Sequence, residues 1–256
     1  SCGMFLTNVI PFARARNKWL RQIDEWKQSY KFSYNKTNNM KTQDVICAIN
    51  TYLEVSKHNN YIITAGVGNH QMMACQYIKW KYPKSFISSG SLGVMGVGLP
   101  FAIGSQLADP SKLVIDIDGD GSFNHTLSEL KTIMNYDLPI KIAIMNDGCF
   151  SMVNAWENLF FEERYIATDL IKNPDYVKLA DAYGIKSICC DSQSDLRKTI
   201  KEFLEYDKAI LCEFKVEKDL CFPLVPPGAA LDEMFFDTTE LVSRGSRNKT
   251  ELIPPS

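Results

Sequence analysis

Three aspartates that alternate along one short stretch are the residues of this chain best suited to bind a cation. The stretch reads VIDIDGDGSFNHTLSEL over residues 114–130, and its aspartates are Asp116, Asp118 and Asp120. Carboxylate oxygens are hard ligands, which Ca2+ and Mg2+ prefer. The spacing therefore predicts a site for a hard divalent cation, and two kinds of site have this composition.

A calcium-binding EF-hand loop is the first interpretation. The pattern Asp-x-Asp-x-Asp-Gly matches the opening of such a loop, from Asp116 to Gly121. The position that must supply a bidentate carboxylate at the end of the loop is Leu127, and Glu129 comes too late to replace it. A β-branched run precedes the aspartates where an EF-hand would have a helix. The sequence therefore argues against calcium sensing.

A site for magnesium and a diphosphate is the second interpretation. The GDG triplet at 119–121 follows one predicted strand, and Asn146 and Asp147 end the next. Neighbouring parallel strands joined by one crossover end at the same edge of a sheet, so we expect Asp120 and Asp147 to meet there. Mg2+ binds carboxylates and shares its remaining positions with phosphates. The glycines allow close backbone approach, and Ser122 is expected to begin a helix whose free amides attract anions.

The hydrophobic pattern predicts the elements that must hold these residues in place. Trp19, Ile23 and Trp26 recur at helical spacing, which predicts a linker helix near the N-terminus. From residue 61, short β-branched runs alternate with helical segments, which predicts an α/β fold with a parallel sheet flanked by helices on both faces. The expected organisation is an N-terminal extension over residues 1–57, a binding domain over 58–236 and a C-terminal tail over 237–256.

The composition argues against several other classes of protein. A formal net charge of -2 provides no field that would gather nucleic acid or anionic lipid, so neither is an expected partner. No stretch of the sequence has the length of a membrane span or the order of a secretory signal. The eight cysteines lack a Cys-x-x-Cys pair and are expected to be reduced thiols in an intracellular, soluble protein.

The spacing of the GDG triplet carries a resemblance to a known family. Gly-Asp-Gly followed about two dozen residues later by two asparagines is the signature of thiamine diphosphate enzymes, and this chain resembles it with Asp147 as the second of the pair. Four further segments are similar to the catalytic subunit of acetohydroxyacid synthase, also called acetolactate synthase: TAGVGNHQM (64–72), SSGSLGVMGVGLPFAIGSQLA (88–108), SMVNAWENLFFEERY (151–165) and NPDYVKLADAYGIK (173–186). The stretch NKWLRQIDEWKQSY (17–30) resembles that family's link from its central to its last domain. The chain is thus identified as similar to the C-terminal, thiamine diphosphate-binding domain.

The resemblance implies a magnesium site and a cofactor site. The side chains of Asp120 and Asp147 and the backbone carbonyl of Cys149 would bind Mg2+, and the Met95 side chain would hold thiamine diphosphate in a bent form. The residues expected to contact the cofactor are Val67, Gly68, Asn69, His70, Gly93, Met95, Gly119, Asp120, Gly121, Ser122, Asp147, Cys149, Phe150, Ser151 and Met152.

The resemblance also implies an activity. Members of this family decarboxylate pyruvate and condense it with a second 2-keto acid in branched-chain amino acid biosynthesis. Met152 and Val153 would flank the reacting carbon, and Trp156 would shape the acceptor pocket. Two alternatives remain, namely a non-catalytic module that binds thiamine diphosphate or serves assembly, and another thiamine-dependent 2-keto acid decarboxylase.

Several features depart from the family pattern. Asp147 adds a negative charge beside the diphosphate, and Asn69, Met73, Ser91, Ser151 and Ala155 replace the residues usual at their positions. Family members have three domains, of which the first carries the glutamate that activates the cofactor and the central one holds most of the flavin site. We therefore expect a partner chain with the pyrimidine-binding domain, in a homo- or hetero-oligomer. FAD is expected only if a central domain is supplied.

Overall fold

The computed structural model describes residues 2–56, 58–170 and 172–237, and the chain divides into two compact units, residues 1–35 and 36–256. The first unit contains one long helix, α1 (Cys2–Ser29). Trp19 and Trp26 are both exposed, and their rings pack edge to face with centroids 5.4 Å apart. Residues seven apart lie on the same face of a helix, which explains this contact and confirms the helix predicted from their spacing.

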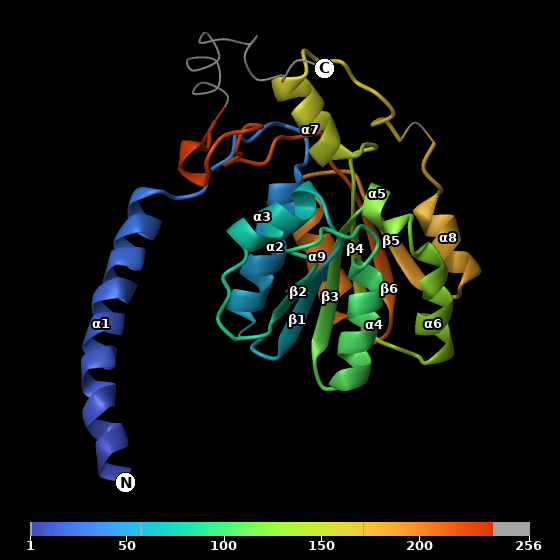
Figure 1. Cartoon of the computed structure of the whole chain (residues 1–256). Helices are drawn as coiled ribbons and strands as arrows, with labels where there is room; N and C mark the ends of the chain where they lie inside the picture. Colours follow the sequence, from blue (N-terminus) through green and yellow to red (C-terminus); the bar gives the residue numbers. More distant parts are fainter. Residues whose placement is uncertain (1, 57, 171, 238–256) are drawn as a thin grey trace. The chain divides into compact units, whose positions relative to one another are not determined.

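The second unit is built around a six-stranded sheet in which every pair of neighbours is parallel (Figure 1). The strand order is β2-β1-β3-β4-β6-β5. The strands are β1 (Tyr61–Ala65), β2 (Phe86–Ser88), β3 (Leu113–Gly119), β4 (Lys141–Asn146), β5 (Lys186–Cys190) and β6 (Ile210–Lys215). The predicted α/β fold class is confirmed, and the crossover between β3 and β4 makes them neighbours as expected.

Helices cover both faces of this sheet (Figure 1). One face packs against α2 (Thr42–Val55), α3 (Asn69–Tyr77) and α9 (Leu196–Glu205), and the other against α4 (Gly98–Ala108), α6 (Leu130–Asn135) and α8 (Tyr176–Ala182). Each interior strand buries both of its faces, so its sequence reads as a nearly continuous apolar run. The strand β4 is the clearest case, since all six of its residues are buried.

The second unit begins earlier in the sequence than the expected boundary at residue 58. Val45, Ile46 and Ile49 of α2 have no solvent exposure and belong to the same apolar core as α3 and α9. A helix that buries this much apolar surface is part of the domain and not of a linker. Of the expected tail, only residue 237 is described, and residues 238–256 lie outside the described part of the chain.

Ion pairs and hydrogen bonds join the segment that precedes α2 to the segment that follows β6. Lys41 Nζ lies 3.1 Å from Asp219 Oδ2 and 3.4 Å from Glu217 Oε1. The Thr37 hydroxyl and the Asn39 amide donate to the two oxygens of Glu217, at 2.6 and 3.1 Å. We call this network of Thr37, Asn39, Lys41, Glu217 and Asp219 the clasp. Three of its five members come from the entering segment, so it fixes where that segment runs.

The single helix expected to begin at Ser122 is instead broken into three pieces. They are α5 (Asp120–Phe123), the 3-10 helix η1 (Leu127–Glu129) and α6. Phe123 is fully buried against the Tyr176 ring, and the Thr126 hydroxyl donates to the Gly96 carbonyl at 2.7 Å. These tertiary contacts outweigh helical propensity, which amounts to less than about 1 kcal/mol per residue.

None of the described helices is long and apolar enough to cross a membrane.

The packing of α9 on β6 gives a first test of the core. Phe203 is fully buried, and its ring meets that of Phe214 at 90° with centroids 6.2 Å apart. We expect Phe203→Ala to lower the free energy of unfolding by about 3–5 kcal/mol, because the cavity left behind cannot close completely. Urea denaturation measures the change. On the exposed side of the same helix, Lys201→Ala should change the value by less than about 0.5 kcal/mol, and equal losses in the two variants would contradict the packing described here.

Candidate functional site

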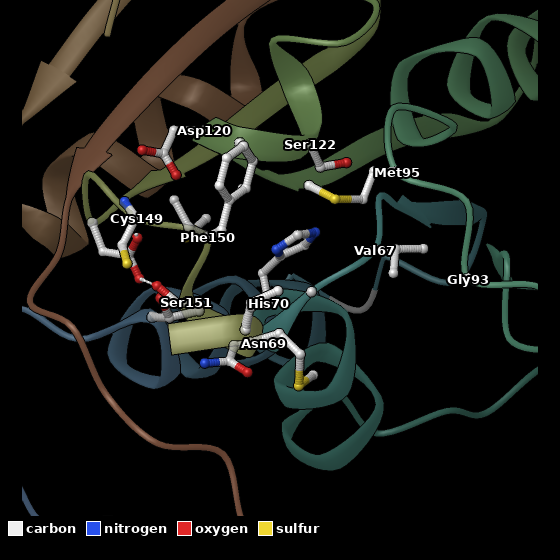
Figure 2. A pocket seen from close by; sticks show the side chains of 18 residues that line it. Val67, Asn69, His70, Gly93, Met95, Asp120, Ser122, Cys149, Phe150 and Ser151 are labelled. Carbon is white, nitrogen blue, oxygen red and sulfur yellow. Dashed lines mark hydrogen bonds between the residues drawn. The ribbon is translucent and has the colours of Figure 1, made fainter. Parts of the chain in front are cut away.

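A cavity of about 200 Å3 opens at the carboxyl ends of β1, β3 and β4. Its walls come from the loop after β1 with the start of α3, the loop before α4, the β3–α5 turn, and the loop between β4 and α7 (Ser151–Phe160). Every residue predicted to contact a cofactor lines this cavity, and so does Val153. Figure 2 shows the side chains of His70, Met95 and Asp120 around the same space. Together with Thr42 at the start of α2, the structure thus gathers residues from five segments that are far apart in the sequence.

Trp156 is the one predicted site residue that does not line the cavity. It lies on α7, one helical turn beyond Met152, and its ring packs against Phe160 with centroids 5.3 Å apart. Thr42 and Met145, which sequence reasoning did not single out, are lining residues. Neither belongs to a recognisable motif. Thr42 is the first residue of α2 and Met145 is the last residue but one of β4, and only the packing of these elements brings both to the cavity.

Two carboxylates lie at the tips of the neighbouring strands β3 and β4. Asp120 follows Gly119, which pairs with Met145 across the ladder, and Asp147 follows the end of β4. Asp120 Oδ2 accepts the Gly148 N–H at 3.0 Å. Asp147 accepts the Cys149 N–H at 3.1 Å on one oxygen and the Ser151 hydroxyl on the other. The loop after β4 therefore contacts both carboxylates and sets their orientation.

The loop before α4 places Met95 in the cavity wall. The Gly96 N–H donates to Ser122 Oγ at 2.9 Å, and the Gly96 carbonyl accepts the Thr126 hydroxyl at 2.7 Å. Gly96 has a φ of +83°, and a Cβ there would lie 2.7 Å from the His125 Cβ, so only glycine fits. Because Gly96 is held by these two hydrogen bonds, the preceding residue, Met95, is held in a fixed position in the cavity wall.

Comparison with known proteins bears on what this cavity holds. Residues 66–214 match the family described as "Thiamine pyrophosphate enzyme, C-terminal TPP binding domain". The chain belongs to this family. The matched region runs from the end of β1 to β6 and so contains most of the residues that line the cavity, among them both carboxylates.

Several curated relatives of this thiamine pyrophosphate-binding domain are acetolactate synthases. The catalytic subunit from Saccharomyces cerevisiae, named as mitochondrial, is 40% identical over 98% of this chain and 36% of its own length. The mitochondrial enzyme from Schizosaccharomyces pombe is 44% identical over 86% of this chain and 33% of its own length. A probable large subunit from Methanococcus aeolicus is 35% identical over 84% of this chain and 36% of its own. The chain spans about a third of the length of these relatives.

The donor set of the thiamine pyrophosphate-binding domain fits a magnesium ion. Burial, together with the nearby charge of Asp147, raises the pKa of Asp120 to about 6, although hydrogen bonds from the Asn173 amide and two backbone N–H groups oppose the change. Burial also raises the pKa of Asp147, against the Ser151 hydroxyl and the Cys149 N–H. Two carboxylates that repel each other, one buried and one partly buried, are stabilised when a divalent cation lies between them. Among the described hydrogen bonds, none engages the Cys149 carbonyl, the third predicted ligand.

The predicted cation site would rely on few side chains. Within the described ranges, no group of three or more His, Cys, Asp or Glu residues converges on one point. A site with two carboxylates and one carbonyl therefore leaves several positions of an octahedral shell to water or to phosphate oxygens, which is the arrangement Mg2+ favours.

The glycines of the GDG triplet leave room for the protein's own side chains. A Cβ on Gly119 would lie 2.7 Å from His70 Nδ1, and one on Gly121 would lie 2.7 Å from the Phe150 ring. The sequence had suggested that these glycines let a diphosphate approach the backbone. In the structure they allow His70 and Phe150 to form the cavity wall.

Asn173 is a site residue that sequence reasoning missed. Its amide nitrogen lies 2.6 Å from Asp120 Oδ2 and 3.2 Å from Asn146 Oδ1, and its own oxygen accepts the Asn124 amide at 3.1 Å. The residue is 53 positions beyond Asp120 and stands before α8, so no local pattern connects the two. It lies behind the predicted metal ligand, where it fixes the carboxylate orientation.

Removing the Asn173 amide should weaken the predicted metal site. We expect Asn173→Ala to lower the Mg2+ affinity by roughly tenfold, because Asp120 loses the donor that orients it. Isothermal titration of the chain with MgCl2 and thiamine diphosphate measures the change. Asn158→Ala is the matched control. It also removes an asparagine amide that donates a hydrogen bond, in this case to the Tyr165 hydroxyl, but Asn158 does not line the cavity. A loss of equal size in both variants would count against this role.

The raised pKa of Asp120 predicts how stability depends on pH without metal. The folded-state value of about 6 exceeds the ordinary value of 3.8, so between these values the folded state binds more protons than the unfolded state. The free energy of unfolding should fall as pH rises from about 4 to about 6, by roughly 3 kcal/mol from this residue. Urea titrations at several pH values in EDTA measure it. The decline should be shallower in Asp120→Asn, and saturating Mg2+ should reduce it in the unchanged chain.

Proposed function

We propose that this chain is the cofactor-binding part of a thiamine diphosphate- and Mg2+-dependent carboligase of the acetolactate synthase type. Such an enzyme decarboxylates pyruvate and condenses it with a second 2-keto acid in branched-chain amino acid biosynthesis. The observation that carries the proposal is the pair Asp120 and Asp147 at adjacent strand ends, inside a region that matches a thiamine pyrophosphate-binding family. The names of the relatives support the choice of reaction.

Different parts of the cavity would bind the metal ion and the diphosphate. Asp120, Asp147 and the Cys149 carbonyl would hold Mg2+ where β3 and β4 end, and diphosphate oxygens would complete its shell. Asn69 and His70 would face the diphosphate from the start of α3. The cofactor, when bound, supplies the nucleophilic carbon and the electron sink that decarboxylation needs.

Met95, Met152 and Val153 would act near the reacting carbon. The Met95 side chain, fixed by the anchored Gly96, would support the bend of the cofactor. Met152 and Val153 lie in the first turn of α7 and would exclude water from one side of the substrate. Trp156 packs on Phe160 outside the cavity, so a role in the acceptor pocket would require a pocket that extends along α7.

A partner chain is part of the proposal. Val153 and Leu92, at the mouth of the cavity and in the loop before Met95, are 52% and 84% exposed. A pyrimidine-binding domain with its activating glutamate would cover this edge, in a homo- or hetero-oligomer, and FAD would require a central domain. We also propose an intracellular location, which the seven free cysteines of the described ranges support.

A non-catalytic module is the second candidate, and the loop after β4 favours it. Both oxygens of Asp147 already accept hydrogen bonds from Cys149 and Ser151, and its charge would lie beside an anionic diphosphate. Such a module would bind thiamine diphosphate without turnover. Another thiamine-dependent 2-keto acid decarboxylase would instead release an aldehyde.

Titration of the purified chain with thiamine diphosphate tests the site. We expect binding that requires Mg2+ and that weakens at least tenfold in Asp120→Ala, because the variant loses a metal ligand. Asp181→Ala, an exposed aspartate on α8, should bind as the unchanged chain does. Mg2+-independent binding of equal strength in all three would remove Asp120 from the site.

Product analysis then separates the candidates. The chain is combined with a separately expressed glutamate-bearing domain and supplied with pyruvate, thiamine diphosphate and Mg2+. Acetolactate formation supports the carboligase, aldehyde release supports the decarboxylase, and cofactor binding without product under any pairing supports the non-catalytic module.

A further inference from the structure

A buried glutamate interrupts the apolar sequence of β6. Glu213 is the fourth residue of this strand, whose first five residues are all buried, and it is only 4% exposed. Burying a carboxylate is unfavourable unless polar groups bond to it, so its place in an apolar strand requires an explanation. Glu213 does not line the cofactor cavity, and no motif of the sequence includes it.

The partner of Glu213 is the last residue of β4. Glu213 pairs with Ile144 in the parallel ladder, and Asn146 is two residues beyond Ile144, so the Asn146 side chain lies on the same face of the sheet as that of Glu213. Asn146 Nδ2 donates to Glu213 Oε1 at 2.6 Å, and the Lys215 ammonium forms an ion pair with the same oxygen. The carboxylate is thus bonded to the residue that immediately precedes Asp147.

The surroundings of Asn146 allow its amide only one orientation. The Glu213 carboxylate can only accept a hydrogen bond, whereas the Gly148 N–H, 3.2 Å from Asn146 Oδ1, can only donate one. A half-turn of the amide would place its NH2 group against the Gly148 N–H and its oxygen against the carboxylate. Glu213 and Gly148 therefore hold Asn146 with its oxygen turned away from β6.

Asn173 carries this orientation to the predicted metal ligand. Its Nδ2 lies 3.2 Å from Asn146 Oδ1 and 2.6 Å from Asp120 Oδ2, so one NH2 group donates in two directions. Its Oδ1 accepts the Asn124 amide at 3.1 Å, and Asn124 Oδ1 accepts the Tyr176 hydroxyl at 2.9 Å. Every amide in this series thus has its donor and acceptor sides fixed by a neighbour.

We propose that Glu213 is a positioning residue for the metal site. By accepting a hydrogen bond from Asn146 it fixes the two amides, Asn146 and Asn173, that orient the Asp120 carboxylate. We call Glu213, Asn146 and Asn173 the amide relay. Glu213 acts through this relay and does not contact the cation itself. The inference rests on the proposed function for the identity of that cation as Mg2+.

The amide relay also lines a second cavity, of about 670 Å3, on the side of β4 that faces β6. Its other walls include Lys178 and Lys215, whose side chains are 85% and 50% exposed. Small solutes can therefore reach the Glu213 position without passing through the cofactor cavity. This access allows a missing carboxylate to be replaced from solution.

Substitutions at Glu213 test its acceptor oxygen and its charge separately. Glu213→Ala removes both and should lower the Mg2+ affinity by about tenfold, in isothermal titration with MgCl2 at a fixed concentration of thiamine diphosphate. Glu213→Gln keeps an acceptor oxygen of the same reach without the charge, so its affinity should stay within about threefold of that of the unchanged chain. Equal losses in the two variants, or an unchanged affinity in Glu213→Ala, would contradict the proposal.

A matched control and a second apolar variant protect this test. Glu202→Ala removes an exposed glutamate of α9 that pairs with Lys186 at 2.8 Å, and it should bind Mg2+ as the unchanged chain does. Circular dichroism and thermal unfolding check that each variant is folded. If Glu213→Ala does not fold, Glu213→Leu takes its place, because leucine fills similar space without an acceptor.

Replacement of the carboxylate by formate separates positioning from general stability. Sodium formate should restore at least half of the affinity that Glu213→Ala loses, while sodium chloride at the same ionic strength should not. Formate should leave the unchanged chain and Asn173→Ala as they were, since in the second of these the amide relay is broken beyond Glu213. Equal effects of formate and chloride on Glu213→Ala would count against a positioning role.

Hydrogen exchange of the side-chain amides gives a readout without metal or cofactor. Asn146→Ala and Asn173→Ala assign the two NH2 groups in NMR spectra of the labelled full chain. The Asn173 NH2 protons should exchange at least about tenfold faster in Glu213→Ala than in the unchanged chain, because the relay then lacks its fixed end. They should stay protected in Glu213→Gln, and equal rates in all three proteins would overturn the proposal.

The outcomes also distinguish this inference from the proposed function. If the exchange rates change as expected but the unchanged chain binds neither Mg2+ nor thiamine diphosphate, the proposed function fails and the relay serves no metal site. If the unchanged chain binds thiamine diphosphate with Mg2+ and Glu213→Ala binds both equally well, the proposed function stands and the role of Glu213 is wrong.

Discussion

The site depends on one electrostatic constraint, which is that two carboxylates, the buried Asp120 and the partly buried Asp147, stand at the tips of adjacent parallel strands. Parallel pairing of β3 and β4 brings Asp120 and Asp147 to the same edge and leaves no freedom to separate them. Burial and the charge of Asp147 together raise the pKa of Asp120, and a bound proton or cation would relieve the repulsion. The backbone N–H groups of the loop after β4, the Ser151 hydroxyl and the Asn173 amide stabilise the pair in part.

The rest of the second unit serves to keep this arrangement in place. Both faces of the sheet are covered by helices, so the strand tips cannot move relative to each other without disturbing a core that includes α2, α3 and α9 on one side. Side chains behind the cavity wall continue the polar arrangement inward, from His70 to Asp118 and Asp116. Behind the residues that face the cavity there is therefore a second layer of buried polar side chains.

The sequence predicted those parts of the fold and site that depend on local spacing. Strand periodicity and the interval between the GDG triplet and Asp147 were enough to predict the parallel sheet and the meeting of two carboxylates. Sequence reasoning missed Asn173 because its contact with Asp120 spans 53 positions and depends on how α8 docks. The break after Phe123 was missed because it follows from tertiary contacts of Phe123 and Thr126. The residues of α2 were placed in the N-terminal extension because their packing against α3 and α9 appears only in the fold. The contact between His70 and Asp118 likewise appears only when β3 and α3 are packed together.

The clasp has a consequence for how this unit can be carried by larger proteins. It bonds Thr37, Asn39 and Lys41, which lead into the unit, to Glu217 and Asp219, which follow its last strand. The segment that leads into α2 therefore runs beside the segment that follows β6, and polypeptide attached ahead of Thr37 is joined to the unit at this edge. Exchange of neighbouring domains over evolutionary time would then leave the geometry of the strand tips intact.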